Sequence, residues 1–206
     1  MIKIVDYGLG NILAFQNMYK RLNFNVAVAR TAGELADATR IVLPGVGAFD
    51  HAMELLEASG MRGTLDELVL QRHVPVLGIC VGMQILARSS DEGLRAGLGW
   101  IDAHVRGFAA LKRDDLLLPH MGWNDVQPVT TTPLFECLRS ESRFYFLHSY
   151  FFECERPDDV AARTTYGIDF ACAVHAGNIY GVQFHPEKSH HFGAQLLKNF
   201  AELPTC

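Results

Sequence analysis

Residues 74–84 read VPVLGICVGMQ, an apolar run that ends at a cysteine flanked by two glycines. The run predicts a buried strand, and Gly78 and Gly82 predict a sharp turn around Cys80, followed by a helix over 83–90. A G-x-nucleophile-x-G turn exposes the reactive residue at the end of a sheet, where backbone N–H groups favour a thiolate and an oxyanion. We therefore expect Cys80 to be a nucleophile, although a free cysteine at a strand end is more commonly a buried apolar residue.

Composition and charge describe an ordinary globular chain of 206 residues, 49% hydrophobic and 20% charged. This length is enough for one full core, and we expect residues 1–206 to form a single domain. The net charge of −5 excludes the basic surface typical of nucleic-acid-binding proteins. No apolar run reaches the roughly 18 residues that a membrane span needs, and residues 1–8 lack the pattern of a signal peptide.

The cysteines are odd in number and irregularly spaced, without a CxxC pair. They are Cys80, Cys137, Cys154, Cys172 and Cys206. This pattern argues against a disulfide framework and against a zinc site. A reducing cytoplasm is the expected compartment.

Short apolar runs alternate with helical patterns through the first half of the chain, which is typical of βαβ units and a parallel sheet. The expected strands are 2–7, 24–29, 40–45 and 74–80, and the expected helices lie within 11–23, 32–38, 51–59 and 64–72. The second half reads as strands over 100–108, 143–153, 159–166 and 170–187, with a hairpin at 175–178, before a closing helix over 190–203. We expect an α/β fold with an open, mostly parallel sheet flanked by helices and an antiparallel extension. Ligands of such sheets bind at the carboxyl ends of the strands.

A candidate base lies in the stretch GVQFHPE, residues 181–187. Val182 and Phe184 read as strand residues, and Pro186 cannot continue the sheet ladder, so His185 falls where the strand stops. A base needs a third group that holds its imidazole in the right tautomer, and Glu187 can accept a hydrogen bond from the far ring nitrogen. Each residue alone is ordinary, but together with Cys80 they favour a catalytic triad.

The stretch LPGVGAF, residues 43–49, also follows an apolar strand. Two glycines after a proline make a tight loop whose backbone can approach a ligand. We expect an oxyanion hole built from backbone N–H groups of Val46, Gly47 and Val81. The loop lacks the GK[ST] of a phosphate-binding loop, and residues 8–11 lack the third glycine of a dinucleotide fingerprint, so no cofactor is expected.

Together, LPGVGAF, GICVGMQ and GVQFHPEKS resemble the motifs of the class I, triad-type glutamine amidotransferases, in the same order and at familiar spacing. Three further stretches, VDYGLGN (5–11), PHMGWN (119–124) and YFLHSY (145–150), resemble the glutaminase subunits of imidazole glycerol phosphate synthases. The resemblance spans nearly the whole chain. Its specificity lies in the combination, because each motif alone is common.

The resemblance implies a mechanism that these residues can perform. Cys80 attacks the side-chain amide carbon of L-glutamine, His185 moves the protons, and Glu187 orients His185. A glutamyl thioester forms on Cys80, ammonia leaves, and water then releases glutamate.

The resemblance also implies a set of residues that hold glutamine. They are Gly47, Gln84, Glu92, His148, Ser149 and Tyr150. Taken alone, Gln84 reads as a solvated helix residue and Glu92 as part of a solvated turn. His148 and Ser149 read as the polar end of an aromatic strand.

A protein partner follows from the same resemblance, because ammonia released into water would be protonated and lost as a nucleophile. The implied partner is a (β/α)8-barrel cyclase subunit, bound as a heterodimer, that uses the ammonia to make imidazole glycerol phosphate and AICAR in histidine biosynthesis. The candidate interface residues are Asn11, Trp123, Asn124, Tyr145 and Lys188. Trp123 is the strongest of these, since tryptophan is enriched at binding hot spots, although a core tryptophan is the alternative.

One alternative concerns the consumer of the ammonia. His190, His191 and the Phe192-Gly193 pair, with Ala14-Phe15 in the first helix, resemble a variant branch that supplies ammonia for amidino sugars of surface polysaccharides. The triad would be unchanged in such a variant. The two histidines lack the further ligands that a metal site needs, so we expect no metal.

Two other classes stay open at this point. A cysteine hydrolase acting on a peptide or small ester would use the same nucleophile, work without a partner and ignore glutamine. A regulatory subunit would only bind the barrel, and the presence of Cys80, His185 and Glu187 argues against it.

Overall fold

The apolar runs form strands and the amphipathic stretches form helices in the computed structural model, which describes residues 1–112, 115–138 and 142–204. The strands are β1 (Ile2–Val5), β2 (Val26–Ala29), β3 (Arg40–Gly45), β4 (Val76–Cys80), β5 (Ser89–Ser90), β6 (Ala103–Gly107), β7 (His120–Asp125), β8 (Gln127–Pro128), β9 (Arg143–His148), β10 (Tyr150–Cys154), β11 (Val160–Tyr166), β12 (Ile168–Ala176) and β13 (Ile179–Val182). The α-helices are α1 (Ile12–Arg21), α2 (Ala32–Leu35), α3 (Phe49–Ala58), α4 (Arg62–Asp66), α5 (Val81–Gln84) and α6 (His190–Glu202). The shorter helical turns are the π-helical η1 (Glu67–Gln71) and the 3-10 turns η2 (Phe108–Leu111), η3 (Pro133–Phe135), η4 (Pro157–Asp159) and η5 (Pro186–Lys188).

The strands pair into one 11-stranded sheet, whose main path runs β2-β1-β3-β4-β13-β12-β10-β6-β5. From β2 to β13 the neighbours are parallel, whereas β12, β10 and β6 extend the sheet in antiparallel fashion. This arrangement confirms the predicted class, an open, mostly parallel sheet with an antiparallel extension. The predicted hairpin at 175–178 is also confirmed, since β12 and β13 pair directly across it.

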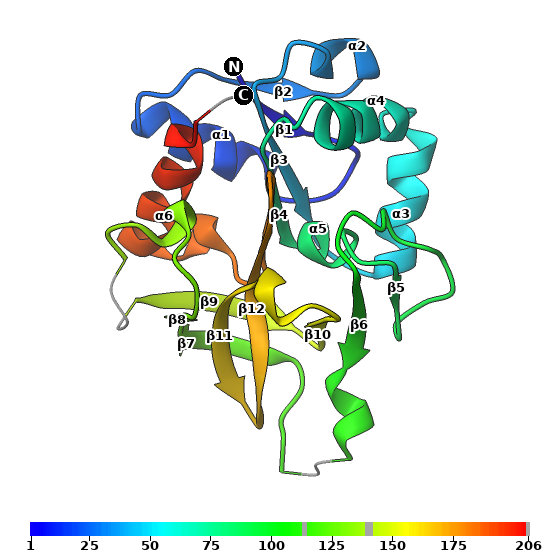
Figure 1. Ribbon diagram of the computed structural model, residues 1–206, viewed down its shortest axis with the longest axis vertical. Coiled ribbons are helices and arrows are strands. Elements are labelled where there is room, and N and C mark those ends of the chain that lie inside the picture. Colours follow the sequence, from blue (N-terminus) through cyan, green and yellow to red (C-terminus); the bar gives the residue numbers. More distant parts are fainter. Residues whose placement is uncertain (113–114, 139–141, 205–206) are drawn as a thin grey trace.

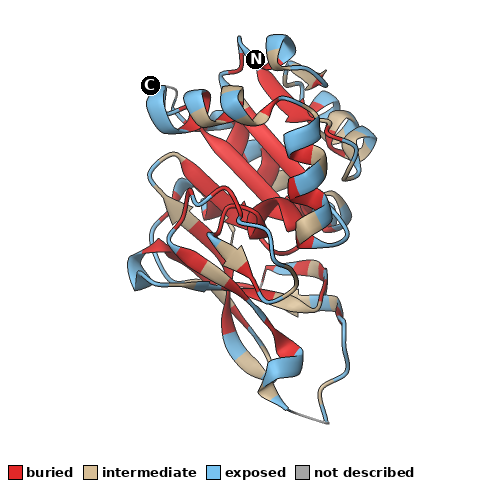
Figure 2. Cartoon of the chain, turned by 90° about the vertical axis from the view of Figure 1, so that its right-hand side faces the viewer, coloured by how far each residue is buried: buried red, intermediate tan, exposed pale blue. Residues whose placement is uncertain are grey.

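Helices cover both faces of the parallel half. Figure 1 shows α1 and α6 on one face, with α3, α4 and α5 on the other. The strands between them, β3 and β4 above all, are buried almost throughout, and the outward helix faces are exposed (Figure 2). Continuous apolar strands of this kind are stable only when both faces are covered, which explains why these runs form parallel strands. None of the helices within the described ranges is long and apolar enough to cross a membrane.

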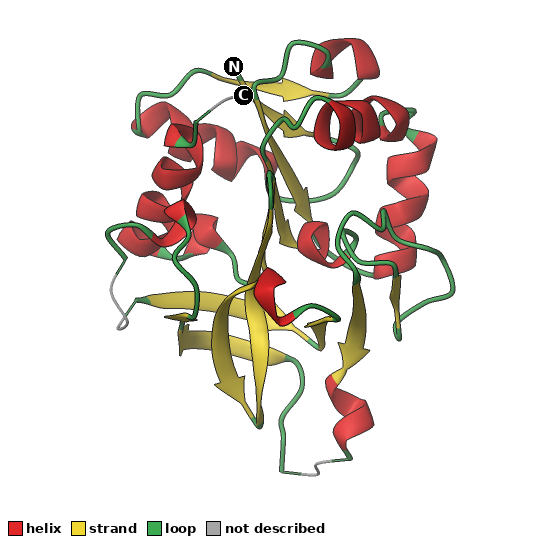
Figure 3. Cartoon of the chain, viewed as in Figure 1, coloured by secondary structure: helices red, strands yellow, loops and turns green. Residues whose placement is uncertain are grey.

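A second, two-stranded sheet pairs β7 with β9 and lies beside the antiparallel extension (Figure 3). The sequence analysis predicted one strand over 143–153, but the chain breaks at Ser149 and its two halves join different sheets. The β9 half pairs with β7, and the β10 half pairs with β6 and β12. The bend at Ser149 therefore connects the two sheets.

The helix predicted over 83–90 is wrong in its length, because α5 ends at Gln84 and the chain turns into β5. The carbonyl groups that a longer helix would use accept hydrogen bonds from another segment. Leu98 N–H donates to Ile85 O at 2.8 Å and Ile101 N–H donates to Leu86 O at 3.1 Å. A tertiary contact thus overrides a local helical pattern that the sequence does contain.

Three strand ends converge on one edge of the sheet. In the parallel register Gly45 of β3 lies beside Cys80 of β4, and Val182 of β13 lies beside Ile79. The chain leaves these strands through the loop at 45–48, the turn into α5, and the segment that carries His185. The fold therefore brings the three motifs of the sequence analysis to the same place.

Candidate active site

Cys80 occupies a backbone conformation that few residues other than glycine adopt. It ends β4 with φ 56° and ψ −114°, so the chain reverses sharply at the cysteine itself. A Cβ at Gly82 would overlap the carbonyl oxygen of Leu43, and one at Gly78 would overlap the carbonyl of Gly82. The flanking glycines are required by this close backbone packing. Strain of this kind costs roughly 1–3 kcal/mol and clusters at functional sites.

His185 and Glu187 form a buried pair beyond the end of β13, which stops at Val182 and not at Phe184 as predicted. The Nδ1 atom of His185 lies 2.9 Å from Oε1 of Glu187, and the two side chains are 4% and 2% exposed. Because a carboxylate accepts, Nδ1 donates, which leaves Nε2 to face the thiol. Nε2 has no partner of ordinary hydrogen-bond geometry among the described residues.

The environment of His185 favours its charged form. Burial disfavours the imidazolium, but interactions with the Cys80 thiol and with Glu187 outweigh burial and raise the pKa of His185 from 6.5 to about 9. A histidine beside a thiol and a carboxylate stabilises a thiolate–imidazolium pair. This is the electrostatic arrangement that an attacking cysteine needs.

Backbone contacts to β9 fix the position of the histidine loop. His185 N–H donates to Tyr145 O at 2.8 Å, and the fully buried Ser189 hydroxyl donates to His185 O at 2.6 Å. Ser189 Oγ in turn accepts from Tyr145 N–H at 3.0 Å. The two-stranded sheet therefore holds His185 in place, which ties the His185–Glu187 pair to β9.

A cavity of about 280 Å³ opens over the cysteine. All but one of the predicted catalytic, oxyanion-hole and substrate-binding residues line it, namely Val46, Gly47, Cys80, Val81, Gln84, Glu92, His148, Ser149, Tyr150 and His185. Glu187 lies behind His185 and contacts it directly. A cavity of this size suits a small ligand such as an amino acid.

Hydrogen bonds between residues 92–95 and the start of α3 hold Glu92 beside the cavity. Its Oε2 accepts from Phe49 N–H at 2.8 Å, at the first residue of α3. Asp50 of that helix accepts from Leu94 N–H at 2.9 Å and from Arg95 N–H at 3.0 Å. These hydrogen bonds position residues 92–95 against α3, the helix that follows residues 44–47.

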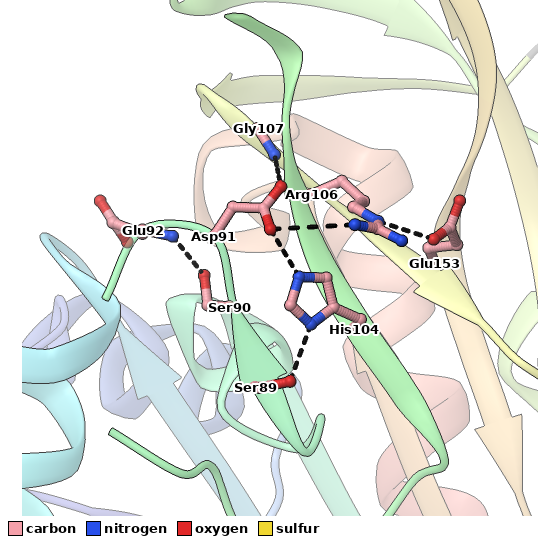
Figure 4. Close-up of polar contacts among 8 residues, drawn as sticks. All are labelled: Ser89, Ser90, Asp91, Glu92, His104, Arg106, Gly107 and Glu153. Atoms are coloured by element: carbon pink, nitrogen blue, oxygen red, sulfur yellow. Dashed lines mark hydrogen bonds and ion pairs between the residues drawn. The ribbon is translucent and has the colours of Figure 1, made fainter. Parts of the chain in front are cut away.

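The neighbouring Asp91 anchors the same loop to β6, so the 91–92 segment is not simply a solvated turn. Figure 4 shows its carboxylate accepting from the His104 ring at 2.6 Å and from Gly107 N–H at 3.1 Å. The hydrogen bond from His104 is the main reason why the pKa of Asp91 is lowered. Arg106 lies 3.9 Å away and reaches on to Glu153 at 2.8 Å.

The sequence analysis did not identify Gln183, which approaches the nucleophile directly. It is fully buried, its Nε2 lies 3.8 Å from Cys80 Sγ, and its Oε1 accepts from Gln84 Nε2 at 3.0 Å. The signal available in the sequence was a polar residue inside the apolar strand GVQF. Tyr7 was missed as well: its hydroxyl is buried, and burial together with the nearby Cys80 raises the pKa of Tyr7.

Three of the five candidate interface residues lie close together, and the side chains of the other two are hydrogen-bonded within the protein. Trp123 and Tyr145 are paired on β7 and β9, and Lys188 Nζ lies 5.6 Å from the centre of the Tyr145 ring. Asn11 caps α1 by accepting from Ala14 N–H at 3.3 Å. The Asn124 side-chain amide donates a hydrogen bond to Thr165 O at 2.9 Å.

No group of three or more histidine, cysteine or acidic side chains in the described part of the chain is arranged to hold a metal ion. Cys137, Cys154 and Cys172 are free thiols, and Cys206 lies outside the described residues. Burial raises the pKa of Cys154 to about 12 and raises that of Cys172 further. The half-buried Cys154 and the buried Cys172 are therefore poor nucleophiles.

The arrangement as a whole suits acyl transfer. A thiol at a sheet edge, an imidazole that exchanges protons with it, and a carboxylate that orients the imidazole are the parts of a cysteine triad. Val46, Gly47 and Val81, the residues expected to supply an oxyanion hole, line the same cavity.

Known proteins resemble this chain in sequence and in fold. Residues 3–203 match the model of the family described as glutamine amidotransferase class-I. A protein of Bdellovibrio bacteriovorus named imidazole glycerol phosphate synthase subunit HisH is 63% identical, over 98% of this chain and 100% of its own. A protein of the same name from Leptospira interrogans is 52% identical over the same shares of the two chains. A solved structure titled as a glutamine amidotransferase superposes with a TM-score of 0.76 at 19% identity, covering 98% of this chain and 97% of its own, which bears on the fold alone.

Replacing Glu187 with glutamine should lower the pKa of His185. The amide can still accept from Nδ1–H, but the charge that stabilises the imidazolium is lost, so the pKa should fall by roughly 1–3 pH units from its value of about 9. An NMR titration of the His185 ring measures this directly. Because the folded pKa exceeds the value of 6.5 for a free histidine, the pair's contribution to stability is complete below pH 6.5 and is lost as pH rises through about 9.

The matched control is Asp91→Asn, which removes a carboxylate that is bonded to a different histidine, His104. It should leave the titration of His185 unchanged. A His185 pKa that is the same in the Glu187→Gln variant as in the parent protein would show that the pair does not act as described.

Proposed function

The chain belongs to the class-I glutamine amidotransferase family, and on that premise we propose that it is the glutaminase subunit of an imidazole glycerol phosphate synthase. The observation that carries the proposal is the placement of Cys80 and His185 in the wall of a single cavity, with Glu187 bonded to His185 at 2.9 Å. Relatives that bear the subunit's name match along their whole length, which supports the same assignment.

In the proposed reaction Cys80 Sγ attacks the side-chain amide carbon of L-glutamine. The carbonyl oxygen becomes an oxyanion, which backbone N–H groups of the 46–47 loop and of Val81 stabilise. His185 gives its proton to the departing nitrogen, so that ammonia leaves and a glutamyl thioester remains. Water, deprotonated by His185, then attacks the thioester carbon and releases glutamate and the free thiol.

The walls of the cavity suit the two ends of glutamine. Glu92, which lines the cavity, offers a carboxylate for the substrate's ammonium group. Ser149, Tyr150 and Gln84 also line the cavity, and Gln84 is buried rather than solvated. The exposed Gly47, with φ 93°, lies at the rim, where its backbone can meet the amide.

An exposed apolar patch beside the cavity supports a protein partner. Val46, Met121, Trp123 and Leu147 are exposed by 41%, 64%, 39% and 36%. Met121 faces Leu147 across the β7–β9 pair, and Val46 and Leu147 also line the cavity. A patch of this kind at the mouth of a site is typical of an interface. Docking there would shield the ammonia from water.

We assign that place to the (β/α)8-barrel cyclase subunit, in a heterodimer. The cyclase would use the ammonia to make imidazole glycerol phosphate and AICAR in histidine biosynthesis. This division of labour agrees with the absence of a GK[ST] phosphate-binding motif from the sequence of this chain.

The purified chain should release glutamate from glutamine, and the rate should rise when the cognate cyclase and its acceptor ligand are added. Cys80→Ala should lower the rate at least about a thousandfold, as loss of a triad nucleophile does. Cys137→Ala, which removes an exposed thiol, is the control and should leave the rate unchanged. Glutamate release that persists without Cys80 would contradict the mechanism, and hydrolysis of esters but not of glutamine would point to a cysteine hydrolase.

Trp123→Ala should weaken the complex with the cyclase by about 2 kcal/mol, the size typical of an interfacial tryptophan. Isothermal titration calorimetry measures the dissociation constant. Leu94→Ala is the matched control, because Leu94 is 100% exposed and lies outside the apolar patch. Equal affinities for the Trp123→Ala variant and the parent chain would rule out β7 as the docking face.

A further inference from the structure

A chain of hydrogen bonds runs behind the cavity wall, and His148 is at its centre. His148 Nδ1 lies 2.7 Å from Tyr150 O, and its Nε2 lies 2.9 Å from Nδ1 of His120. A carbonyl oxygen only accepts, so Nδ1 of His148 carries the proton. The bare Nε2 therefore accepts from His120. Both ring nitrogens of His148 are thus hydrogen-bonded to groups of the protein itself.

The next hydrogen bond also donates toward Tyr150. Because Nδ1 of His120 donates, its Nε2 is bare and accepts from the Asn124 amide at 3.3 Å. The same amide nitrogen donates to Thr165 O at 2.9 Å. The Tyr150 carbonyl thus fixes the position of every proton along the chain, and each histidine has one defined tautomer.

Burial keeps both rings neutral. His120 is stacked on Phe146 at 4.8 Å and on Tyr166 at 4.0 Å, measured between ring centres. Desolvation lowers the pKa of His148 to about 3 and that of His120 to about 4. Neutral imidazoles are required for this pattern, since a charged ring would have two donors and no acceptor.

This chain of hydrogen bonds ends at the part of the backbone that shapes the cavity. Ser149 is the bend between the two sheets, and the His148–Tyr150 hydrogen bond spans it. The same Tyr150 carbonyl accepts from Gln84 Nε2 at 3.4 Å. Through Gln84 the contacts reach Gln183, whose amide lies 3.8 Å from the Cys80 sulfur.

We propose that His120 is a positioning residue for the glutaminase, an inference that rests on the proposed function. By donating to Nε2 it holds His148 in the Nδ1–H tautomer, and His148 in turn holds the Ser149–Tyr150 wall in the shape that accepts glutamine. His148 acts through the backbone of this wall and has no ring nitrogen left to bind substrate. His120 touches no substrate and forms no part of the cavity lining.

Two amide substitutions at His120 separate its two hydrogen bonds. In His120→Asn the amide nitrogen replaces Nδ1 and keeps the donor to His148, whereas in His120→Gln the amide replaces Nε2 and loses that donor. The KM for glutamine should stay within about twofold for His120→Asn and rise about tenfold for His120→Gln, the effect of one hydrogen bond. The kcat should change less than KM, because the triad itself is untouched.

The tautomer of His148 is the second readout, and a merely structural role for His120 would not change it. Nitrogen-15 NMR distinguishes a protonated from a bare ring nitrogen. His148 should be protonated at Nδ1 in the parent chain and in His120→Asn, and should lose this single tautomer in His120→Gln. An unchanged KM and an unchanged tautomer in His120→Gln would overturn the proposal.

Folding is checked by thermal unfolding of each variant. If His120→Gln does not fold, His120→Phe keeps the ring stacking and removes both hydrogen bonds, and it should show the same rise in KM. If neither folds, the parent chain decides the question, because a His148 protonated at Nε2 contradicts the geometry. Failure of the parent chain to release glutamate would sink the proposed function instead, and would leave the tautomer measurement unaffected.

Discussion

The contact on which the site depends is the close approach of the β3 end to the turn at Cys80. Gly82 packs against the Leu43 carbonyl so tightly that no side chain fits between them, and Cys80 itself adopts φ 56°. A strained turn of this kind persists only where the surrounding structure holds the backbone in place. Here the parallel strand β3 does so, since it pairs with β4 as far as Cys80. Through this turn a thiol is presented at the sheet edge, beside Val46 and Gly47 of the loop that lines the same cavity.

The second half of the site is built by the junction of two sheets. The segment that follows β13 carries His185 out of the main sheet, and hydrogen bonds between this segment and Tyr145 on β9 hold it in place. β9 and β10 meet at Ser149, and that bend forms a wall of the cavity. Three residues of the exposed apolar patch, Met121, Trp123 and Leu147, lie on the same two-stranded sheet. The surface proposed to bind the cyclase and the segment that carries His185 therefore share one scaffold. This is a physical route by which docking can affect catalysis.

The sequence was sufficient for the features that local chemistry determines. Alternating apolar and helical patterns predicted the parallel half, and glycine and proline punctuation placed Cys80 at a strand end. The same reasoning placed His185 and Glu187 close after a strand, although β13 stops earlier than predicted, at Val182. Features that depend on distant contacts were not predictable in this way. The helix after Cys80 stops because residues 97–101 take its carbonyl groups, and the strand over 143–153 bends because its halves find different partners. Gln183 and His120 were missed since a buried polar residue reveals its role only through its partners.

The most direct test of the account is covalent labelling of the chain with a diazoketone analogue of glutamine, followed by mass spectrometry of the cysteine peptides. The account predicts one adduct, on Cys80, that forms more slowly when glutamine is present, because the electrophile must enter the glutamine cavity to reach the Cys80 sulfur. Exposed Cys137 is an internal reference for simple accessibility. Labelling of Cys137 in preference to Cys80, or labelling of Cys80 that glutamine does not slow, would contradict the claim that this cysteine is the nucleophile of a glutamine site.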